Sequence, residues 1–232
     1  MSTLIKYRST LFLNSTAVRF SILSVLRFIL FTPFMQFILA LVCMSSLHAE
    51  NLIQKENSLP GSIDWQLTRI KVDNGGCRAV NVEGYCSKQS VRAGESIDIM
   101  VSSSPARDFK LEFFRTGYYG GCGARLMHTI DRVAGVTQPD PHIGDNDLHE
   151  CHWKPSVTWT IPRDWISGVY LGRMTTLPQG NEPYWQSYVI FIVRDDRPAD
   201  VLFQCSDNTW QAYNVWPSHY SVYTHPKGGQ GP

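Results

Sequence analysis

Glu95-Ser-Ile-Asp-Ile-Met-Val101 decides the fold class of this chain. Ile97, Ile99 and Val101 recur at every second position, so in an extended segment their side chains share one face. The preceding Arg92-Ala-Gly-Glu95 is typical of a tight turn. Residues 95–101 therefore predict a β-strand that buries one face against a core.

Similar strand-like runs follow toward the C-terminus, with turn signals between them. Phe109-Lys-Leu-Glu-Phe113 alternates in the same way, and Ser187-Tyr-Val-Ile-Phe-Ile-Val193 carries a continuous apolar run, as expected of a central strand covered on both faces. In Asp164-Trp-Ile-Ser-Gly-Val-Tyr170, the Gly-x-Tyr at a strand entry is the pattern of a tyrosine corner, which gives Trp165 and Tyr170 structural roles. The patterns together predict a mainly β fold, an Ig-like antiparallel β-sandwich over residues 62–197.

Two loops between these strands contain residue types that carry chemistry. Gly117-Tyr-Tyr-Gly-Gly-Cys-Gly123 lacks the Lys-Ser/Thr of a phosphate loop, so we interpret it as a hairpin turn that needs positive φ. A loop that packs against the following domain is the alternative. His149-Glu-Cys-His152, with Asp145 and Asp147 nearby, is dense in metal-ligand types but matches no zinc spacing. The aperiodic stretch 133–154 is therefore interpreted as a long, solvated surface loop.

The pattern changes after Pro198. Val201-Leu-Phe-Gln204 predicts a buried strand, followed at residues 206–208 by the N-cap of a helix with Trp210 in the core. An α/β domain opens in this way, and one βαβ unit takes roughly 30 residues. Residues 198–232 are therefore expected to be the truncated, incomplete start of an α/β domain, sensitive to proteases because its strand lacks partners.

Polar side chains crowd the segment that follows this predicted strand. Ligands of open α/β sheets bind outside the carboxyl ends of the strands, so these side chains are candidates for a binding edge. Helix capping suffices to explain Asp207, whereas for Tyr213 beside Asn214 a structural and a ligand-binding role both stay open. The polar set is Asp207, Thr209, Gln211, Tyr213 and Asn214.

Residues 1–49 have the composition of a secretory signal. Basic residues precede apolar runs, and the segment ends in Ser46-Leu-His-Ala49, with the small residue Ala49 before the expected cleavage point. The alternative is a membrane anchor through residues 20–44, although basic and proline residues interrupt its apolar run. We therefore expect export to the periplasm or outside the cell, membrane contact only through an uncleaved signal, and a linker over residues 50–61.

The expected export bears on the oxidation state of the cysteines. Cys77, Cys86, Cys122, Cys151 and Cys205 would lie in an oxidising compartment, where cysteine pairs form disulfides. Cys77 with Cys86, and Cys122 with Cys151, are the pairings considered, and the sequence alone derives neither. Cys205 would be left over and is interpreted as a small apolar core residue.

Composition excludes two classes of protein. The formal net charge is +1, and no Lys/Arg cluster follows residue 50, which argues against a nucleic-acid partner. A hydrophobic content of 43% and seven tryptophans exclude a disordered chain. The chain is therefore expected to be globular.

Several separated motifs occur in the order found in a known family. They are Val82-Glu-Gly-Tyr-Cys-Ser87, Phe114-Arg-Thr-Gly-Tyr-Tyr-Gly-Gly-Cys-Gly-Ala-Arg-Leu-Met127, Asp164-Trp-Ile-Ser-Gly-Val-Tyr-Leu171 and Tyr188-Val-Ile-Phe-Ile-Val-Arg-Asp-Asp196, and the match continues from Phe203 to Asn214. With these motifs the chain resembles the large (β) subunit family of N,N-dimethylformamidase. The resemblance covers roughly residues 60–232.

The resemblance implies a β-sandwich joined to an α/β domain, hydrolysis of a small amide, and a second subunit. It also implies a mononuclear iron held by two tyrosines and a glutamate, hard oxygen ligands that suit ferric iron as a Lewis acid. Tyr213 is the one position carried over as an iron ligand, because the second tyrosine and the glutamate would fall beyond Pro232. We therefore expect a fragment of an exported amide hydrolase that is inactive as it stands and binds no iron by itself.

An exported binding module is the alternative function. An Ig-like sandwich would engage a carbohydrate or a protein through aromatic loops, with residues 200–232 as a vestigial tail. A purely structural subunit completed by another chain is a third interpretation. The candidate contacts of the module are Trp153, Trp159, Tyr184 and Trp185, most of which are expected in the core.

Overall fold

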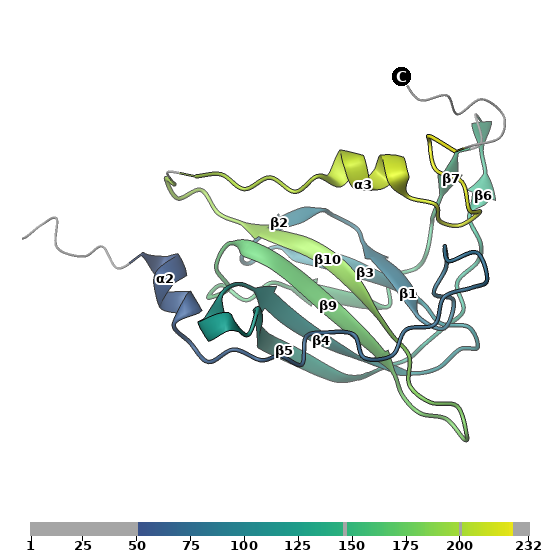
Figure 1. Cartoon of the computed structure of the whole chain (residues 1–232), viewed down its shortest axis with the longest axis horizontal. Helices are drawn as coiled ribbons and strands as arrows, with labels where there is room; N and C mark the ends of the chain where they lie inside the picture. Colours follow the sequence, from purple (N-terminus) through teal and green to yellow (C-terminus); the bar gives the residue numbers. More distant parts are fainter. Residues whose placement is uncertain (1–50, 146–147, 200, 225–232) are drawn as a thin grey trace, which may run out of the picture. The chain divides into compact units, whose positions relative to one another are not determined.

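A computed structural model describes residues 51–145, 148–199 and 201–224 (Figure 1). The signal peptide or anchor predicted over residues 1–49 lies outside the described residues, and so does Asp147. Within the described part, no helix combines the length and the apolar character needed to cross a membrane.

The described chain is mainly β. In chain order its elements are helix α2 (Leu52–Asn57), strands β1 (Glu83–Cys86), β2 (Ser90–Arg92), β3 (Ser96–Ser102) and β4 (Phe109–Thr116), the 3₁₀ turn η1 (Tyr119–Gly121), strands β5 (Ala124–Val133), β6 (His142–Ile143), β7 (His149–Glu150), β8 (Val157–Thr160), β9 (Gly168–Thr176) and β10 (Gln186–Arg194), and helix α3 (Asp207–Tyr213).

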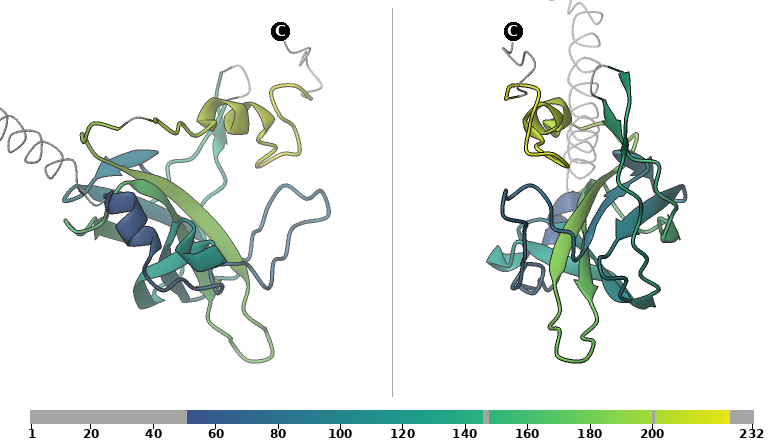
Figure 2. Two further views of the ribbon diagram at one scale, coloured as in Figure 1. Left: turned by 60° about the vertical axis from the view of Figure 1, so that its left-hand side comes forward. Right: turned by 90° about the vertical axis from the view of Figure 1, so that its right-hand side faces the viewer.

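The strands form a three-stranded sheet in the order β1-β3-β8, a five-stranded sheet in the order β2-β10-β9-β4-β5, and the small pair β6-β7. Side chains of both larger sheets share one hydrophobic core. Figures 1 and 2 show the course of the strands in the two sheets. Ile97, Ile99 and Val101 of β3 contribute to it, which confirms the alternation predicted for this strand. The pairing of β2 with β10 is parallel, so the antiparallel prediction holds for the other ladders but not for this one.

Strand β10 differs from its prediction. Val189, Phe191 and Val193 are buried, whereas Ile190 on the opposite face is 40% exposed. The prediction of a strand covered on both faces is therefore wrong. The five-stranded sheet packs against the other large sheet with one face only, and an apolar run does not reveal which face stays open.

The outer face of the five-stranded sheet is covered in part by the segment that precedes β1. Arg173 on β9 donates to the carbonyl oxygens of Asp64 and Gln66, and Tyr188 on β10 donates to that of Trp65. On the same face, Arg173 pairs with Glu112 of β4 at 2.7 Å, and both side chains are buried. Polar side chains therefore anchor residues 64–66 to the sheet.

The tyrosine corner predicted at residues 164–170 is present. The Oη of Tyr170 donates to the carbonyl oxygen of Ile166 at 2.8 Å, and the buried ring of Trp165 stacks on that of Tyr170 with 4.8 Å between centroids. Both residues therefore have the structural roles predicted for them.

The glycine-rich loop 117–123 joins β4 to β5 as a hairpin turn, as predicted. Gly120, Gly121 and Gly123 have positive φ, which side chains other than glycine rarely adopt. The loop packs on α2, because the backbone N–H of Tyr118 donates to the Oδ1 of Asn57 at 2.8 Å. Helix α2 thus occupies the segment predicted as a linker, and it is attached to the β-sheet region through this turn.

The C-terminal segment forms no strand where one is predicted. Val201, Leu202 and Phe203 are 83%, 89% and 79% exposed, and no described strand pairs with them. A strand needs a neighbour for its backbone hydrogen bonds, and the described chain provides none here. Ser206 is the N-cap of α3, as predicted, but Trp210 is 49% exposed, so its predicted place in the core is wrong.

Neither cysteine pairing is formed. Cys77, Cys86, Cys122, Cys151 and Cys205 are all free thiols. Cys86 lies against the core, where burial raises the pKa of its thiol to about 12. Cys77 lies on a loop, and its thiol contacts the carboxylate of Asp73 instead. Cys205 is only partly buried beside α3, which contradicts its predicted place in a core.

Candidate functional site

The loop from Val72 to Arg78 folds around the carboxylate of Asp73. Its Oδ1 accepts the backbone N–H groups of Cys77 at 2.9 Å and of Arg78 at 3.4 Å, and its backbone carbonyl accepts that of Gly76 at 3.0 Å. Burial opposes ionisation of Asp73, but hydrogen bonds from Cys77 and Arg78 and the charge of His219 lower its pKa overall. The carboxylate is therefore held ionised and fixed in position.

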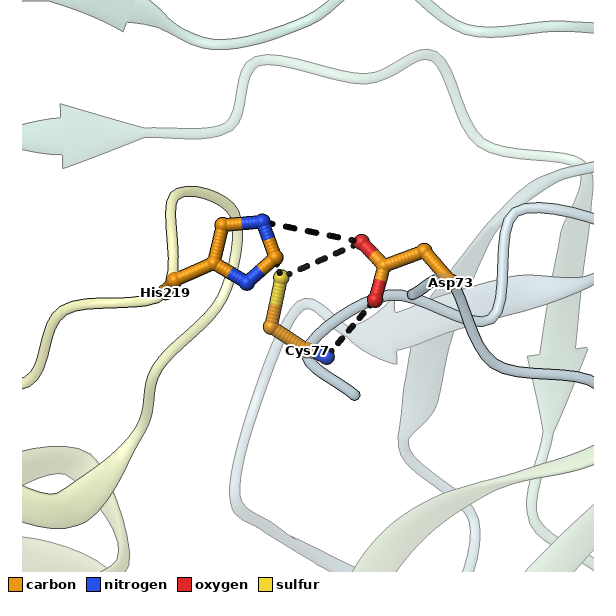
Figure 3. A group of neighbouring side chains, drawn as sticks. All are labelled: Asp73, Cys77 and His219. Atoms are coloured by element: carbon orange, nitrogen blue, oxygen red, sulfur yellow. Dashed lines mark hydrogen bonds and ion pairs between the residues drawn. The ribbon is translucent and has the colours of Figure 1, made fainter. Parts of the chain in front are cut away.

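Two further side chains meet this carboxylate (Figure 3). The Sγ of Cys77 lies 3.3 Å from the Oδ2 of Asp73 and 3.7 Å from the Nε2 of His219. The same Nε2 lies 4.0 Å from the same Oδ2. Among the described residues, this is the group in which three His, Cys, Asp or Glu side chains converge closely enough to hold a metal ion.

His219 reaches this loop because the segment after α3 docks on the β-sheet region. The indole Nε1 of Trp216 donates to the Oε2 of Glu83 at 3.0 Å, and the ring of Trp216 packs edge-on against Trp153 with 6.0 Å between centroids. The guanidinium of Arg78 lies over the same ring at 5.2 Å. Trp216 therefore anchors the segment three residues before His219.

Gly75 makes room for the imidazole. A Cβ on Gly75 would lie 1.7 Å from the Cε1 and 1.8 Å from the Nδ1 of His219, which no real contact allows. The ring therefore rests directly on the backbone of the loop. Any side chain at residue 75 would displace either the loop or the histidine.

The arrangement does not fit nucleophilic catalysis. In a triad, the base faces the nucleophile with one ring nitrogen and the orienting carboxylate with the other. Here the Nε2 of His219 faces both Cys77 and Asp73. Burial and the neighbouring Asp73 also raise the pKa of the Cys77 thiol, whereas an activated cysteine has a lowered one. Three different donor atoms converging on one point fit a metal ion better.

Tyr213, predicted as an iron ligand, lies elsewhere. It is 64% exposed at the end of α3, and its ring contacts that of Tyr223 with 4.8 Å between centroids. Its hydroxyl has no hydrogen-bond partner within residues 51–145, 148–199 and 201–224. A metal ion needs several converging ligands, so the described surroundings of Tyr213 do not fit the implied iron.

The other polar residues near α3 do not converge either. Gln204, Asp207 and Thr209 line an open hollow together with Gln89, without an ion pair or a hydrogen bond among these four. Gln211 and Asn214 face solvent. The predicted binding edge therefore carries polar side chains, but they do not enclose a pocket of the kind that binds a ligand.

The segment His149-Glu-Cys-His152 agrees only in part with the predicted solvated loop, because His149 and Glu150 form strand β7 paired with β6, and His149 and Cys151 are half-buried. His152 and Glu150 are exposed and lie 3.9 Å apart, and no third ligand joins them in the described part of the chain. Sequence reasoning thus identified one cysteine–histidine loop and missed the other. Asp73-Asn-Gly-Gly-Cys77 carries the signal of a tight turn between two ligand types, but His219 is 142 residues from Cys77 and no spacing rule reaches it.

The aromatic side chains proposed as contacts of a binding module mostly pack against other residues of the chain. Trp153 is buried, and the ring of Trp159 contacts those of both His128 and Phe113, with centroids 4.5 and 5.2 Å away. Tyr184 and Trp185 are half-buried, with the guanidinium of Arg69 at 5.4 and 5.7 Å from their rings. These side chains therefore form no common open aromatic face.

A comparison with known families gives a match over the second half of the chain. The family described as "N,N-dimethylformamidase beta subunit-like, C-terminal" matches residues 110–232, from β4 through α3 to the end of the chain. No curated protein matches the chain.

Proposed function

We propose that this chain, which belongs to the N,N-dimethylformamidase beta subunit-like family, is part of an exported amide hydrolase and is inactive by itself. The observation that carries the proposal is the family match across β4, β9, β10 and α3. In this proposal the shared core of the two larger sheets is an Ig-like sandwich, and residues 198–232 are the start of an α/β domain.

The inactivity follows from the state of Tyr213. The family resemblance assigns amide hydrolysis to an iron held by two tyrosines and a glutamate, and the described chain offers an exposed Tyr213 beside Tyr223 without a fixed hydroxyl. A ferric ion would supply Lewis-acid activation of water or carbonyl where such a set is complete. We propose that other residues, outside those described, complete the set.

The description of the family as beta subunit-like implies a second subunit. The exposed apolar residues Val201, Leu202 and Phe203 support a contact with a second subunit next to α3. Contiguous exposed apolar side chains mark surfaces that bind another protein. Export is proposed from the composition of residues 1–49.

The test is turnover of N,N-dimethylformamide by the purified, folded chain, measured as release of dimethylamine with and without added ferric iron. The proposal predicts no release above the uncatalysed rate and no retained iron. Iron that stays bound through desalting, together with turnover that Tyr213→Phe abolishes, would overturn the claim of inactivity.

A binding module remains the alternative, and the surroundings of Tyr184 and Trp185 favour it most. Arg69 and Lys71 lie over these rings at 5.4 to 5.7 Å and are exposed to solvent. The positive charges of Arg69 and Lys71, held in place by the rings beneath them, suit an acidic carbohydrate or peptide. A glycan and peptide screen with the purified chain tests it, with Trp185→Ala as the variant that should lose any binding found.

A further inference from the structure

Three side chains from two distant parts of the sequence bring metal-binding atoms to one point (Figure 3). We infer that Asp73, Cys77 and His219 bind one zinc-class divalent ion, which joins the loop 72–78 to the C-terminal segment 215–221. The site is separate from the proposed amide hydrolase activity and does not involve Tyr213.

The spacing of the donor atoms carries the inference. A tetrahedral ion with bonds of about 2.0–2.3 Å holds its ligand atoms about 3.3–3.8 Å apart. The Sγ of Cys77 lies 3.3 Å from the Oδ2 of Asp73 and 3.7 Å from the Nε2 of His219, and the third edge is 4.0 Å. Two edges of a coordination tetrahedron are thus formed before any ion enters. The third, between the Nε2 of His219 and the Oδ2 of Asp73, is longer than the range, so these two atoms must approach by a few tenths of an ångström when the ion binds.

The kinds of donor atom select the class of ion. Thiolate and imidazole suit Zn²⁺ and related borderline ions, whereas Mg²⁺ and Ca²⁺ take oxygen ligands. A set of one sulfur, one nitrogen and one carboxylate oxygen leaves the fourth position for water or another ligand. His219 is exposed on one side, so this position opens to solvent.

The surroundings hold the ligands in place without the ion. The Oδ1 of Asp73 is occupied by the N–H groups of Cys77 and Arg78, which leaves Oδ2 directed at the site. Because Gly75 has no Cβ, the imidazole of His219 packs directly against its backbone. Trp216 fixes the segment by its hydrogen bond to Glu83. The ion would therefore bind with little rearrangement.

The experiment is a titration of the purified, reduced, metal-free chain with Co²⁺ as a spectroscopic substitute for Zn²⁺. We expect a thiolate-to-cobalt charge-transfer absorption that saturates at one ion per chain and disappears when Zn²⁺ displaces the cobalt. Cys77→Ser should abolish this absorption. His219→Ala and Asp73→Asn should each weaken Zn²⁺ binding by at least roughly 100-fold, beyond the 10- to 100-fold cost of losing an outer-shell partner.

Controls separate this site from the other cysteines and histidines. Cys205→Ser and His152→Ala should retain the absorption and the affinity, and circular dichroism should show that every variant is folded. An absent charge-transfer band in the folded wild-type chain would overturn the inference, and so would a band that persists in Cys77→Ser. Amide turnover does not enter the test, so its outcome is independent of the proposed function.

Discussion

The phenol of Tyr170 donates to the carbonyl oxygen of Ile166, 2.8 Å away and four residues earlier in the chain. This hydrogen bond closes the turn that leads into β9, and the buried ring also stacks on Trp165. Tyr170→Phe keeps the ring and removes the hydrogen bond, so we expect a loss of about 1–2 kcal/mol in the free energy of unfolding. Urea unfolding measures it. Tyr118→Phe, at an exposed residue of the neighbouring turn, is the control and should change stability little; an equal loss in both variants would contradict the prediction.

The tyrosine corner could be predicted because its signal is local. Gly168 and Tyr170 stand two residues apart, and the phenol bonds to a carbonyl in the same turn. The alternation of Ile97, Ile99 and Val101 is equally local and was predicted correctly. The exposed face of β10 could not be predicted from its apolar run, because exposure depends on what covers Ile190 in three dimensions.

The buried pair of Arg173 and Glu112 is the second test of the fold. Removing one partner of a buried pair costs about 3–5 kcal/mol. Arg173→Met should fall near the lower end, because Lys110 also contacts Glu112, at 2.8 Å, and shares the charge that is left. Urea unfolding measures the loss. The exposed pair of Arg92 and Asp196 provides a matched control, and Arg92→Met should cost less than about 1 kcal/mol.

Arg173→Met has a second consequence that the control does not share. The guanidinium of Arg173 also donates hydrogen bonds to the carbonyl oxygens of Asp64 and Gln66. Without them, the segment that lies on the outer face of the sheet should become more mobile. Hydrogen exchange at residues 62–69 should rise in this variant and stay unchanged in Arg92→Met. Unchanged exchange in both would mean that Trp65 and Tyr188 hold the segment without the arginine.

The thiol of Cys86 makes stability depend on alkaline pH. Burial raises its pKa to about 12 in the folded chain, against about 8.5 for an unperturbed cysteine in the unfolded chain. Above pH 8.5 the unfolded chain loses this proton while the folded chain keeps it. The contribution of this thiol to the free energy of unfolding should therefore be constant below pH 8.5 and should fall as the pH rises toward 12, by up to about 1.4 kcal/mol per pH unit.

Cys86→Ala tests this prediction. The variant loses a constant amount of stability from the smaller side chain, but it should show a shallower decline between pH 8.5 and pH 10.5 than the wild-type chain. Urea unfolding at both pH values in the presence of reductant measures the two declines. Parallel declines would show that other groups, and not Cys86, cause the alkaline loss.

The cluster of Asp73, Cys77 and His219 shows where sequence reasoning ends. The turn around Asp73 has a local signal, and Cys77 follows it at once, so two of the three members of the cluster are visible in the sequence. His219 joins them only because Trp216 packs against Trp153 and bonds to Glu83. That contact is tertiary, so no local spacing of residues in the sequence predicts it. The exposure of Val201 to Phe203 has the same origin, since a strand forms only where a partner strand is present.

Gly75 offers the sharpest test of how the C-terminal segment is held. In Gly75→Ala the new Cβ would overlap the imidazole of His219, so we expect the segment 215–221 to detach while the core shared by the sheets stays intact. Limited proteolysis should then cut between residues 207 and 224 at least several times faster than in the wild-type chain, where cleavage should concentrate in the exposed residues 201–204. The urea midpoint of the core should change little, because residue 75 lies outside the hydrophobic cluster.

Gly144→Ala, where the added Cβ meets only ordinary contacts, is the matched control and should leave the cleavage pattern unchanged. If Gly75→Ala is cut at the wild-type rate, the loop and the histidine can separate without releasing the segment, and Trp216 alone holds it in place.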